Sequence, residues 1–481
     1  MNRTKEKSAT KGMIWKTLEQ YSVIGIQFLL QIILARIIEP SSYGIIAIVG
    51  IFIGLSNVFI QNGFSVALVR QKEIEKDDIS SVFYFSVLMA ALFYAMIFCV
   101  SPYVSRFFSM PELDALLKVM SVSLFPQVYC SIQNSLLRRQ MDFKAIFITN
   151  IISVAVSGIL AIFAADRGMG VWALALQHVL YCFLFAFMLG FYTKWFPSLV
   201  FSIKKVQGIL SFGWKVLVTS LFDELFNELR SIVIGRYYTS SDLAFFNRGK
   251  QFPNLIMKST NGSLQAVLLP KLSQLQDNKT EMFATIRKSV SVSTFITFPI
   301  LTLLAVSAAL LIELLLTEKW LPCVIYLQLH CLFYATWPVS TTCSQALYAV
   351  GRSDVVAKLE IPRKIIDFVF LVLSMSYGVL AIAASSVLVS VLSGIAYLFV
   401  MQKYLGYKVI WNIKSLAAPV SLSAMAGLAA YLVNYLHFNV LATLSLQIVC
   451  GLFVYMSLAY IFKVEALRMF CINLKAMRKG K

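Results

Sequence analysis

The chain has 481 residues, of which 59% are hydrophobic and only 14% charged, and its mean hydropathy is +0.77. Soluble domains carry about a quarter charged residues, so this composition excludes an ordinary water-soluble protein. Windows of about 20 apolar residues, the length that crosses a bilayer, recur along the chain. The sequence therefore predicts an all-α polytopic membrane protein.

We expect about fourteen transmembrane helices. The first six are predicted at residues 13–36, 44–66, 80–105, 113–137, 145–165 and 170–194. The next six are predicted at 209–236, 242–268, 283–317, 322–350, 355–377 and 378–402. A last pair is predicted at 413–436 and 440–462.

The loops between these helices alternate in charge. If the N-terminus is cytoplasmic, the cytoplasmic segments carry 30 of the 42 Lys and Arg residues and the opposite loops carry five. This bias is the one that the positive-inside rule describes, and it predicts that both termini are cytoplasmic. Topology also accounts for the net charge of +19, so the charge does not indicate a nucleic-acid partner.

The sequence contains an internal repeat. The segment "LARIIEPSSYGII" at 34–46 is similar to "IGRYYTSSDLAFF" at 234–246, and a Trp-Lys pair precedes each at nearly the same spacing. Six spans separate the copies, which predicts two parallel six-helix lobes around a central cavity. We expect a first lobe at 1–200, a second at 201–403, and two additional helices with a basic cytoplasmic tail at 404–481.

The first helix of each predicted lobe carries polar side chains inside an apolar run. A charge near the centre of a transmembrane helix costs about 2.5–3.5 kcal/mol if it faces lipid. These residues are therefore expected to face the hydrated cavity. In the first helix they are Lys16, Glu19, Gln20, Gln27 and Gln31. In the seventh they are Lys215, Asp223, Glu224, Asn227, Glu228 and Arg230.

The eighth helix adds Arg248, Lys250 and Lys258. With Lys16, Lys215 and Arg230 there are then six cations, which exceed the acids Glu19, Asp223, Glu224 and Glu228. Two interpretations stay open. The charges either pair and fasten the seventh and eighth helices together, or the excess of cations binds an anionic cargo.

Two of these acids are also candidates for ion coupling. Glu224 and Glu228 lie one helical turn apart, and burial together with like charge raises the pKa of a carboxylate. The pair, with Asp223, is a candidate to take up a proton or sodium ion. The alternative is permanent neutralisation by Arg230 and Lys258.

No signature of catalysis is present. The sequence has no HExxH, GxSxG or P-loop motif, so it predicts neither an enzyme nor a bound metal or cofactor. A glycan polymerase or ligase is disfavoured because no predicted external loop exceeds about ten residues. A purely structural scaffold would not need buried charges.

The segments "LARIIEPSSYGIIAIV" and "IGRYYTSSDLAFFNRGKQFPNLI", followed by "LLPKLSQLQDN", resemble the polysaccharide-unit flippases. These are the Wzx-type or teichuronic-acid-exporter-like members of the multidrug, oligosaccharidyl-lipid and polysaccharide exporter superfamily. The resemblance covers essentially the whole chain, with Leu243 and Ala244 standing where the first copy of the repeat has Tyr43 and Gly44.

This resemblance implies translocation of oligosaccharide repeat units linked to undecaprenyl pyrophosphate across the bacterial inner membrane, by alternating access, for surface polysaccharide or lipopolysaccharide synthesis. Arg and Lys are natural partners of pyrophosphate. We also expect a monomer that contacts membrane lipids and glycan polymerase or assembly proteins. The alternative is a cation-coupled multidrug exporter of the same superfamily, which should carry a cavity dominated by carboxylates.

Overall fold

The computed structural model describes residues 15, 22–62, 76–436, 438–464 and 466–467. Contacts divide the chain into two compact units, unit 1 at Met1–Ala244 and unit 2 at Phe245–Lys481. The division falls inside one helix, α10. It does not bear on the lobe boundaries at 200 and 403, which stay a prediction from the repeat.

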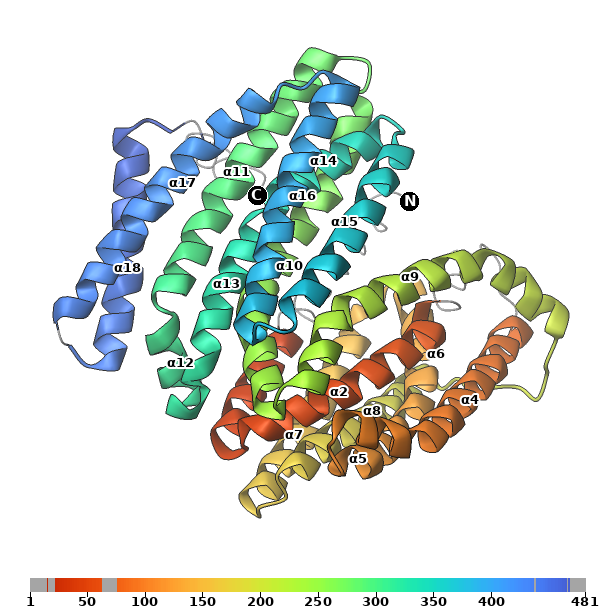
Figure 1. The fold of residues 1–481 in the computed structure, drawn as a ribbon. Helices are drawn as coiled ribbons and strands as arrows, with labels where there is room; N and C mark the ends of the chain where they lie inside the picture. Colours follow the sequence, from red (N-terminus) through yellow and green to blue (C-terminus); the bar gives the residue numbers. More distant parts are fainter. Residues whose placement is uncertain (1–14, 16–21, 63–75, 437, 465, 468–481) are drawn as a thin grey trace. The chain divides into compact units, whose positions relative to one another are not determined.

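The described part of unit 1 is built of helices (Figure 1). A helix over Ser22–Ile37 comes first. It is followed by α2 (Pro40–Asn57), the π-helix η1 (Val58–Asn62), α4 (Lys76–Phe108), α5 (Glu112–Ser121), α6 (Leu124–Arg139), α7 (Phe143–Asp166), α8 (Val171–Thr193) and α9 (Ile203–Tyr237). The helix α10 (Ser240–Gln274) then leads into unit 2.

Unit 2 is likewise helical in its described residues. Its elements are α11 (Lys279–Val306), α12 (Ala308–Leu316), the 3₁₀-helix η2 (Glu318–Cys323), α13 (Val324–Ala335), α14 (Trp337–Ala349), α15 (Ser353–Ser374), α16 (Val379–Leu405), α17 (Val409–Leu432), the 3₁₀-helix η3 (Val433–Leu436) and α18 (Val440–Ile461). Thus helices occupy all the predicted spans that the structure describes.

Nine of the described helical segments are long and apolar enough to cross a membrane. The chain is therefore a multi-pass membrane protein, while the total of fourteen spans stays a prediction. The long helices α9 and α10 are absent from the nine. They carry most of the charged residues singled out in the sequence.

Several predicted spans are interrupted within the structure, and three of them illustrate how. The span expected at 44–66 changes from α-helix to the π-helix η1 at Val58, and the span at 283–317 breaks at Ser307 between α11 and α12. The span at 322–350 breaks at Thr336, just before Pro338 in the first turn of α14. Because proline has no N–H and its ring clashes with the preceding turn, it favours a helix start at this point.

Small polar residues on α7 help it pack inside unit 1. Thr149, Ser153 and Ser157 are buried and each hydroxyl donates to a carbonyl of its own helix. Small residues let helix backbones approach closely in a membrane, and α7 packs along α8 (Figure 1). Leu30 of the first helix lies against Gly158 of α7.

Unit 2 has a buried core where α10 ends. Leu268 and Leu272 of α10 pack there with Ile286 and Val290 of α11 and with residues of α14, α15 and α16. Beside this core, α11 packs along α17, and α17 along α18 (Figure 1). The hydroxyl of Tyr455 on α18 donates to the carbonyl oxygen of Phe295 on α11 at 2.8 Å, which joins these helices.

Candidate functional site

The charged stretch of α9 lies in unit 1, where α9 packs against α2, η1 and α4. Asp223 and Asn227 are exposed, whereas Glu224, Glu228 and Arg230 are half-buried. Helical spacing puts Asp223, Asn227 and Arg230 on one stripe and Glu224 with Glu228 on the neighbouring one, and the two stripes differ in exposure at all but Arg230. The stripe with Glu224 and Glu228 lies closer to neighbouring helices than the stripe that begins at Asp223.

Glu224 lies against a glycine of α2. A Cβ atom built on Gly54 would stand 3.1 Å from Oε1 of Glu224, so the missing side chain lets the carboxylate approach the α2 backbone. Four residues later α2 passes into η1, and the N–H of Val58 donates to the carbonyl of Gly54. Such π-helical turns are rare and frequently occur at functional sites.

Other predicted residues of unit 1 are only partly described. Gln27 and Gln31 are half-buried on the helix Ser22–Ile37. Lys16, Glu19 and Gln20 lie outside the described residues. Lys215 lies on α9, but its side chain is not described.

Arg248 is buried in unit 2, with 7% of its surface exposed. Its guanidinium lies 4.9 Å from the ring centre of Trp320 on η2, and Nη1 donates to Oε1 of Gln251 at 2.8 Å. An aromatic face stabilises a cation most strongly away from water. The ring and the amide therefore compensate for the desolvation of this charge.

The glycine after Arg248 fixes this arrangement. A Cβ on Gly249 would lie 2.7 Å from the backbone nitrogen of Leu327, so any larger residue would push α10 away from α13. Gly249 thus brings the start of α10 against α13, close to η2, where Arg248 meets Trp320. Lys250 is half-buried, and Lys258, about two turns further along α10, is exposed.

The three α10 cations therefore have different surroundings. Arg248 is directed into the core of unit 2, while Lys258 is available at the surface. This difference could not be predicted from the sequence, because the partner Trp320 is distant in the chain. The close contacts at Gly54 and Gly249 were not predicted either. The one sequence feature that indicates them is a glycine inside a predicted helix.

These observations define a class. The described chain is all-helical, crosses the membrane several times and carries charged residues along the long helices α9 and α10. Its fold matches two kinds of solved transporter. The lipid II flippase MurJ in an inward closed conformation matches with a TM-score of 0.74 at 16% identity, covering 94% of this chain and 98% of that chain.

An inward-facing MATE-family multidrug resistance transporter of the MOP superfamily matches with a TM-score of 0.59 at 15% identity, covering 85% of this chain and 99% of that one. The sequence is also similar to named proteins. The lipopolysaccharide biosynthesis protein WzxC of Escherichia coli is 23% identical over 87% of this chain and 86% of its own length.

The succinoglycan biosynthesis transport protein ExoT of Rhizobium meliloti is 24% identical over 61% of this chain. The matched region spans 60% of the length of ExoT. The model of a family described as polysaccharide biosynthesis protein matches residues 33–325. The chain belongs to this polysaccharide biosynthesis family.

Proposed function

We propose that this protein is a flippase for oligosaccharide repeat units linked to undecaprenyl pyrophosphate. It would move them across the inner membrane by alternating access, for the synthesis of surface polysaccharide or lipopolysaccharide. Family membership supports a role in this biosynthesis. The observation that carries the choice of an anionic lipid-linked cargo is the excess of Lys and Arg over Asp and Glu within α9 and α10.

The proposed headgroup site includes Lys16, Lys215, Arg230, Arg248, Lys250 and Lys258. Among the described cations, Lys258 is exposed and Arg230 and Lys250 are half-buried, so direct contact with a phosphate is assigned to these three. Arg248 already contacts Trp320 and Gln251. Its contribution in this conformation is a fixed positive charge.

The carboxylates Asp223, Glu224 and Glu228 are proposed to couple transport to a proton or sodium ion. The closeness of Glu224 to Gly54 and to the start of η1 supports this role, because π-helical turns frequently occur at functional sites and coupling needs the surroundings of the carboxylate to differ between two conformations. Gln27, Gln31 and Asn227, with Glu19 and Gln20, are proposed to hydrogen-bond the sugars.

We further propose a monomer in the inner membrane with cytoplasmic termini, in contact with glycan polymerase or assembly proteins. The second candidate is a cation-coupled multidrug exporter, which is favoured by the MATE-like fold. Such an exporter needs a carboxylate-rich site for cationic drugs, whereas cations predominate on α9 and α10.

Deletion of the gene provides the first test. Cells without this flippase should accumulate repeat units linked to undecaprenyl pyrophosphate on the cytoplasmic face, measured by mass spectrometry of extracted lipids. Complementation with the wild-type gene should clear them. Unchanged lipid-linked glycans together with increased sensitivity to cationic drugs would instead support the exporter.

A further inference from the structure

Two pockets of unit 2 meet at one group of residues at the end where α10 ends and α11 begins. The first, of about 930 Å³, runs between α11 and α17 and reaches the end of α18. The second, of about 500 Å³, runs between α10 and α11. Lys271, Thr285 and Lys288 line both pockets. The two pockets therefore share a basic end at these residues and extend from it on different sides of α11.

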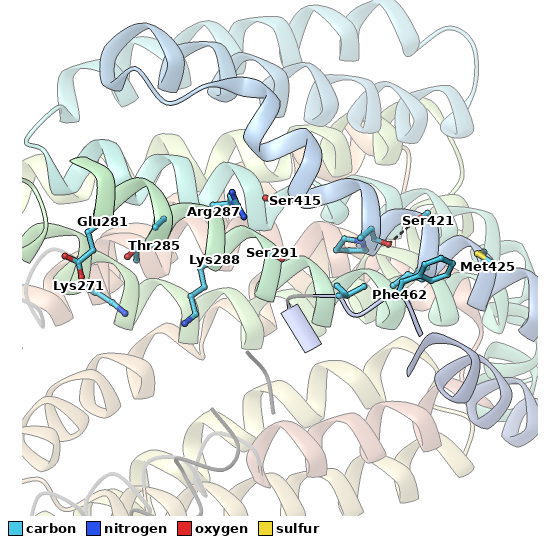
Figure 2. A pocket seen from close by; sticks show the side chains of 15 residues that line it. Lys271, Glu281, Thr285, Arg287, Lys288, Ser291, Ser415, Ser421, Met425 and Phe462 are labelled. Carbon is cyan, nitrogen blue, oxygen red and sulfur yellow. Dashed lines mark hydrogen bonds between the residues drawn. The ribbon is translucent and has the colours of Figure 1, made fainter. Parts of the chain in front are cut away.

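The shared end is positively charged. Lys271, Arg287 and Lys288 line the first pocket, and Glu281 is its one acidic lining residue. Figure 2 shows Lys271, Lys288 and Glu281 together at one end of this pocket, with Met425 and Phe462 at the other. The carboxylate of Glu281 accepts a hydrogen bond from Nδ2 of Asn278, the residue that caps α11. With three cations and one acid, this part of the pocket lining is net positive.

These lysines differ from a second basic cluster in the same unit, on α15. There Arg363 pairs with Glu360 at 2.7 Å, and Lys358 lies 3.9 Å from Asp354. The hydrogen bond from Arg352 lowers the pKa of Asp354, which stays ionised at neutral pH. Within the part of the chain that the structure describes, Lys271 and Lys288 have no such acid as a hydrogen-bonded or ion-paired partner.

From this basic end the pockets extend along the part of α11 that is apolar enough to lie in the bilayer core. After Lys288, residues 289–306 of α11 contain no charged side chain, and 18 residues of helix span about 27 Å, close to the thickness of a bilayer core. Lys288 therefore lies at the edge of the apolar segment of α11. The first pocket continues along α17 from Ser415 to Met425, and the second along α11 to Thr297, each over about 15–18 Å.

The walls of both pockets are held by the core described above. The buried residues Leu272, Ile286 and Val290 are neighbours of the three cations on the same helices. Beyond the cations and Glu281 the linings carry no charge and combine small polar residues with apolar ones, including Leu422 and Met425 in the first pocket and Val292 and Ile296 in the second. Each pocket thus has a basic end and an uncharged remainder.

We propose that this forked site binds an anionic diacyl phospholipid of the bilayer. The phosphate contacts Lys271 and Lys288, with Arg287 beside them, and one acyl chain lies in each pocket. The positive charge of the lysines favours an anionic headgroup. The two pockets that share these lysines favour a lipid with two acyl chains. A polyprenyl carrier has one chain and would leave the second pocket unfilled. Its cations differ from those of the proposed headgroup site for the cargo, and the inference goes beyond the proposed function.

The test uses the purified full-length chain and measures binding of phosphatidylglycerol by native mass spectrometry and by thermal stabilisation. Phosphatidylglycerol should bind at least about tenfold more tightly than phosphatidylcholine, because only its headgroup offers a net negative charge to Lys271 and Lys288. Lysophosphatidylglycerol, with one chain, should bind more weakly than the diacyl lipid. Equal binding of phosphatidylglycerol and phosphatidylcholine by the wild-type protein would by itself overturn the proposal.

Variants locate the site. The double substitution Lys271→Gln and Lys288→Gln should weaken phosphatidylglycerol binding about tenfold or more. Lys279→Gln is the matched control, since Lys279 is an exposed cation on the first turn of α11 that lines neither pocket. Loss of binding in both variants, or in neither, would refute the site, and circular dichroism confirms folding. Complete displacement of phosphatidylglycerol by undecaprenyl phosphate at equal concentration would assign the pockets to the carrier and refute a diacyl lipid.

Discussion

The guanidinium of Arg248 lies 4.9 Å from the ring centre of Trp320, and both side chains are buried. This relationship separates Arg248 from the other cations of α10, which the sequence grouped with it. A buried cation held by an aromatic ring contributes to the stability of unit 2 whether or not it also acts on a cargo.

We therefore predict that Arg248→Ala destabilises the protein. Loss of a desolvated cation–π contact costs about 2 kcal/mol, and the hydrogen bond to Gln251 is lost with it. The expected result is a melting temperature lower by several degrees, measured on detergent-solubilised protein by fluorescence-detected size-exclusion chromatography. Arg248→Lys, which keeps the charge, should recover part of the loss. An unchanged melting temperature for Arg248→Ala would show that this contact adds nothing to folding.

Lys258 should behave in the opposite way. Its side chain is exposed, so Lys258→Gln should leave the melting temperature unchanged. If Lys258 contacts the phosphate, the substitution should lower transport about tenfold or more, because a charge-assisted hydrogen bond contributes about 1.5–3 kcal/mol. Transport is measured as polysaccharide export at matched expression.

Lys319→Gln is a control for Lys258, since Lys319 lies on η2 in a predicted external loop. Full export by Lys258→Gln would remove Lys258 from the headgroup site. A similar loss in both variants would indicate a general effect of charge instead of a contact with the cargo.

Gly54 provides a test of the coupling hypothesis. In Gly54→Ala the new Cβ would lie 3.1 Å from Oε1 of Glu224 and displace the carboxylate. We expect transport to fall at least about fivefold, which corresponds to about 1 kcal/mol, and its response to an imposed pH or sodium gradient to weaken. Glu224→Gln should give the same phenotype.

The matched control is Gly50→Ala, one turn earlier on α2, where an added Cβ meets no atom within 4 Å. Alanine is a better helix former than glycine, so this variant should be at least as stable as wild type and fully active. If Gly54→Ala and Glu224→Gln both transport normally and ignore both gradients, the remaining mechanism is uniport driven by the membrane potential.

The predicted topology can be tested by labelling single cysteines in a cysteine-free background. A cysteine at position 279 should be protected from a membrane-impermeant reagent in intact cells, and one at 319 should be labelled. The two positions lie at opposite ends of α11 and the segment that follows it. Labelling of position 279 from outside would contradict the cytoplasmic assignment.

Much of the fold could be predicted because hydrocarbon imposes a simple requirement on sequence. Long apolar runs bounded by basic loops gave α4 and α16 to within a few residues of their observed bounds. This requirement does not predict where a helix is interrupted. Val58 and Ser307 lie in apolar segments, and such segments are equally compatible with a continuous helix. Their conformations depend on packing against other helices.

The candidate site was less accessible to the sequence. Helical spacing identified the polar stripes of α9, because position along a helix determines which residues share a face. It could not reveal that Glu224 lies against Gly54 or that Arg248 meets Trp320, since both contacts join residues distant in the chain. The shared lining of the two pockets by Lys271 and Lys288 could not be predicted for another reason. In the sequence each lysine resembles the basic residues that ordinarily flank a cytoplasmic loop.

The most direct test of the proposed function is transport by the purified protein in liposomes. The cargo is a fluorescent oligosaccharide linked to undecaprenyl pyrophosphate, and its exposure on the opposite leaflet is followed by quenching with an impermeant reagent. Wild-type protein should accelerate translocation over empty liposomes, and the double variant Arg230→Ala and Lys258→Ala should not. If wild type leaves translocation at the rate of empty liposomes, yet exchanges a cationic drug for protons in the same vesicles, the flippase assignment is contradicted.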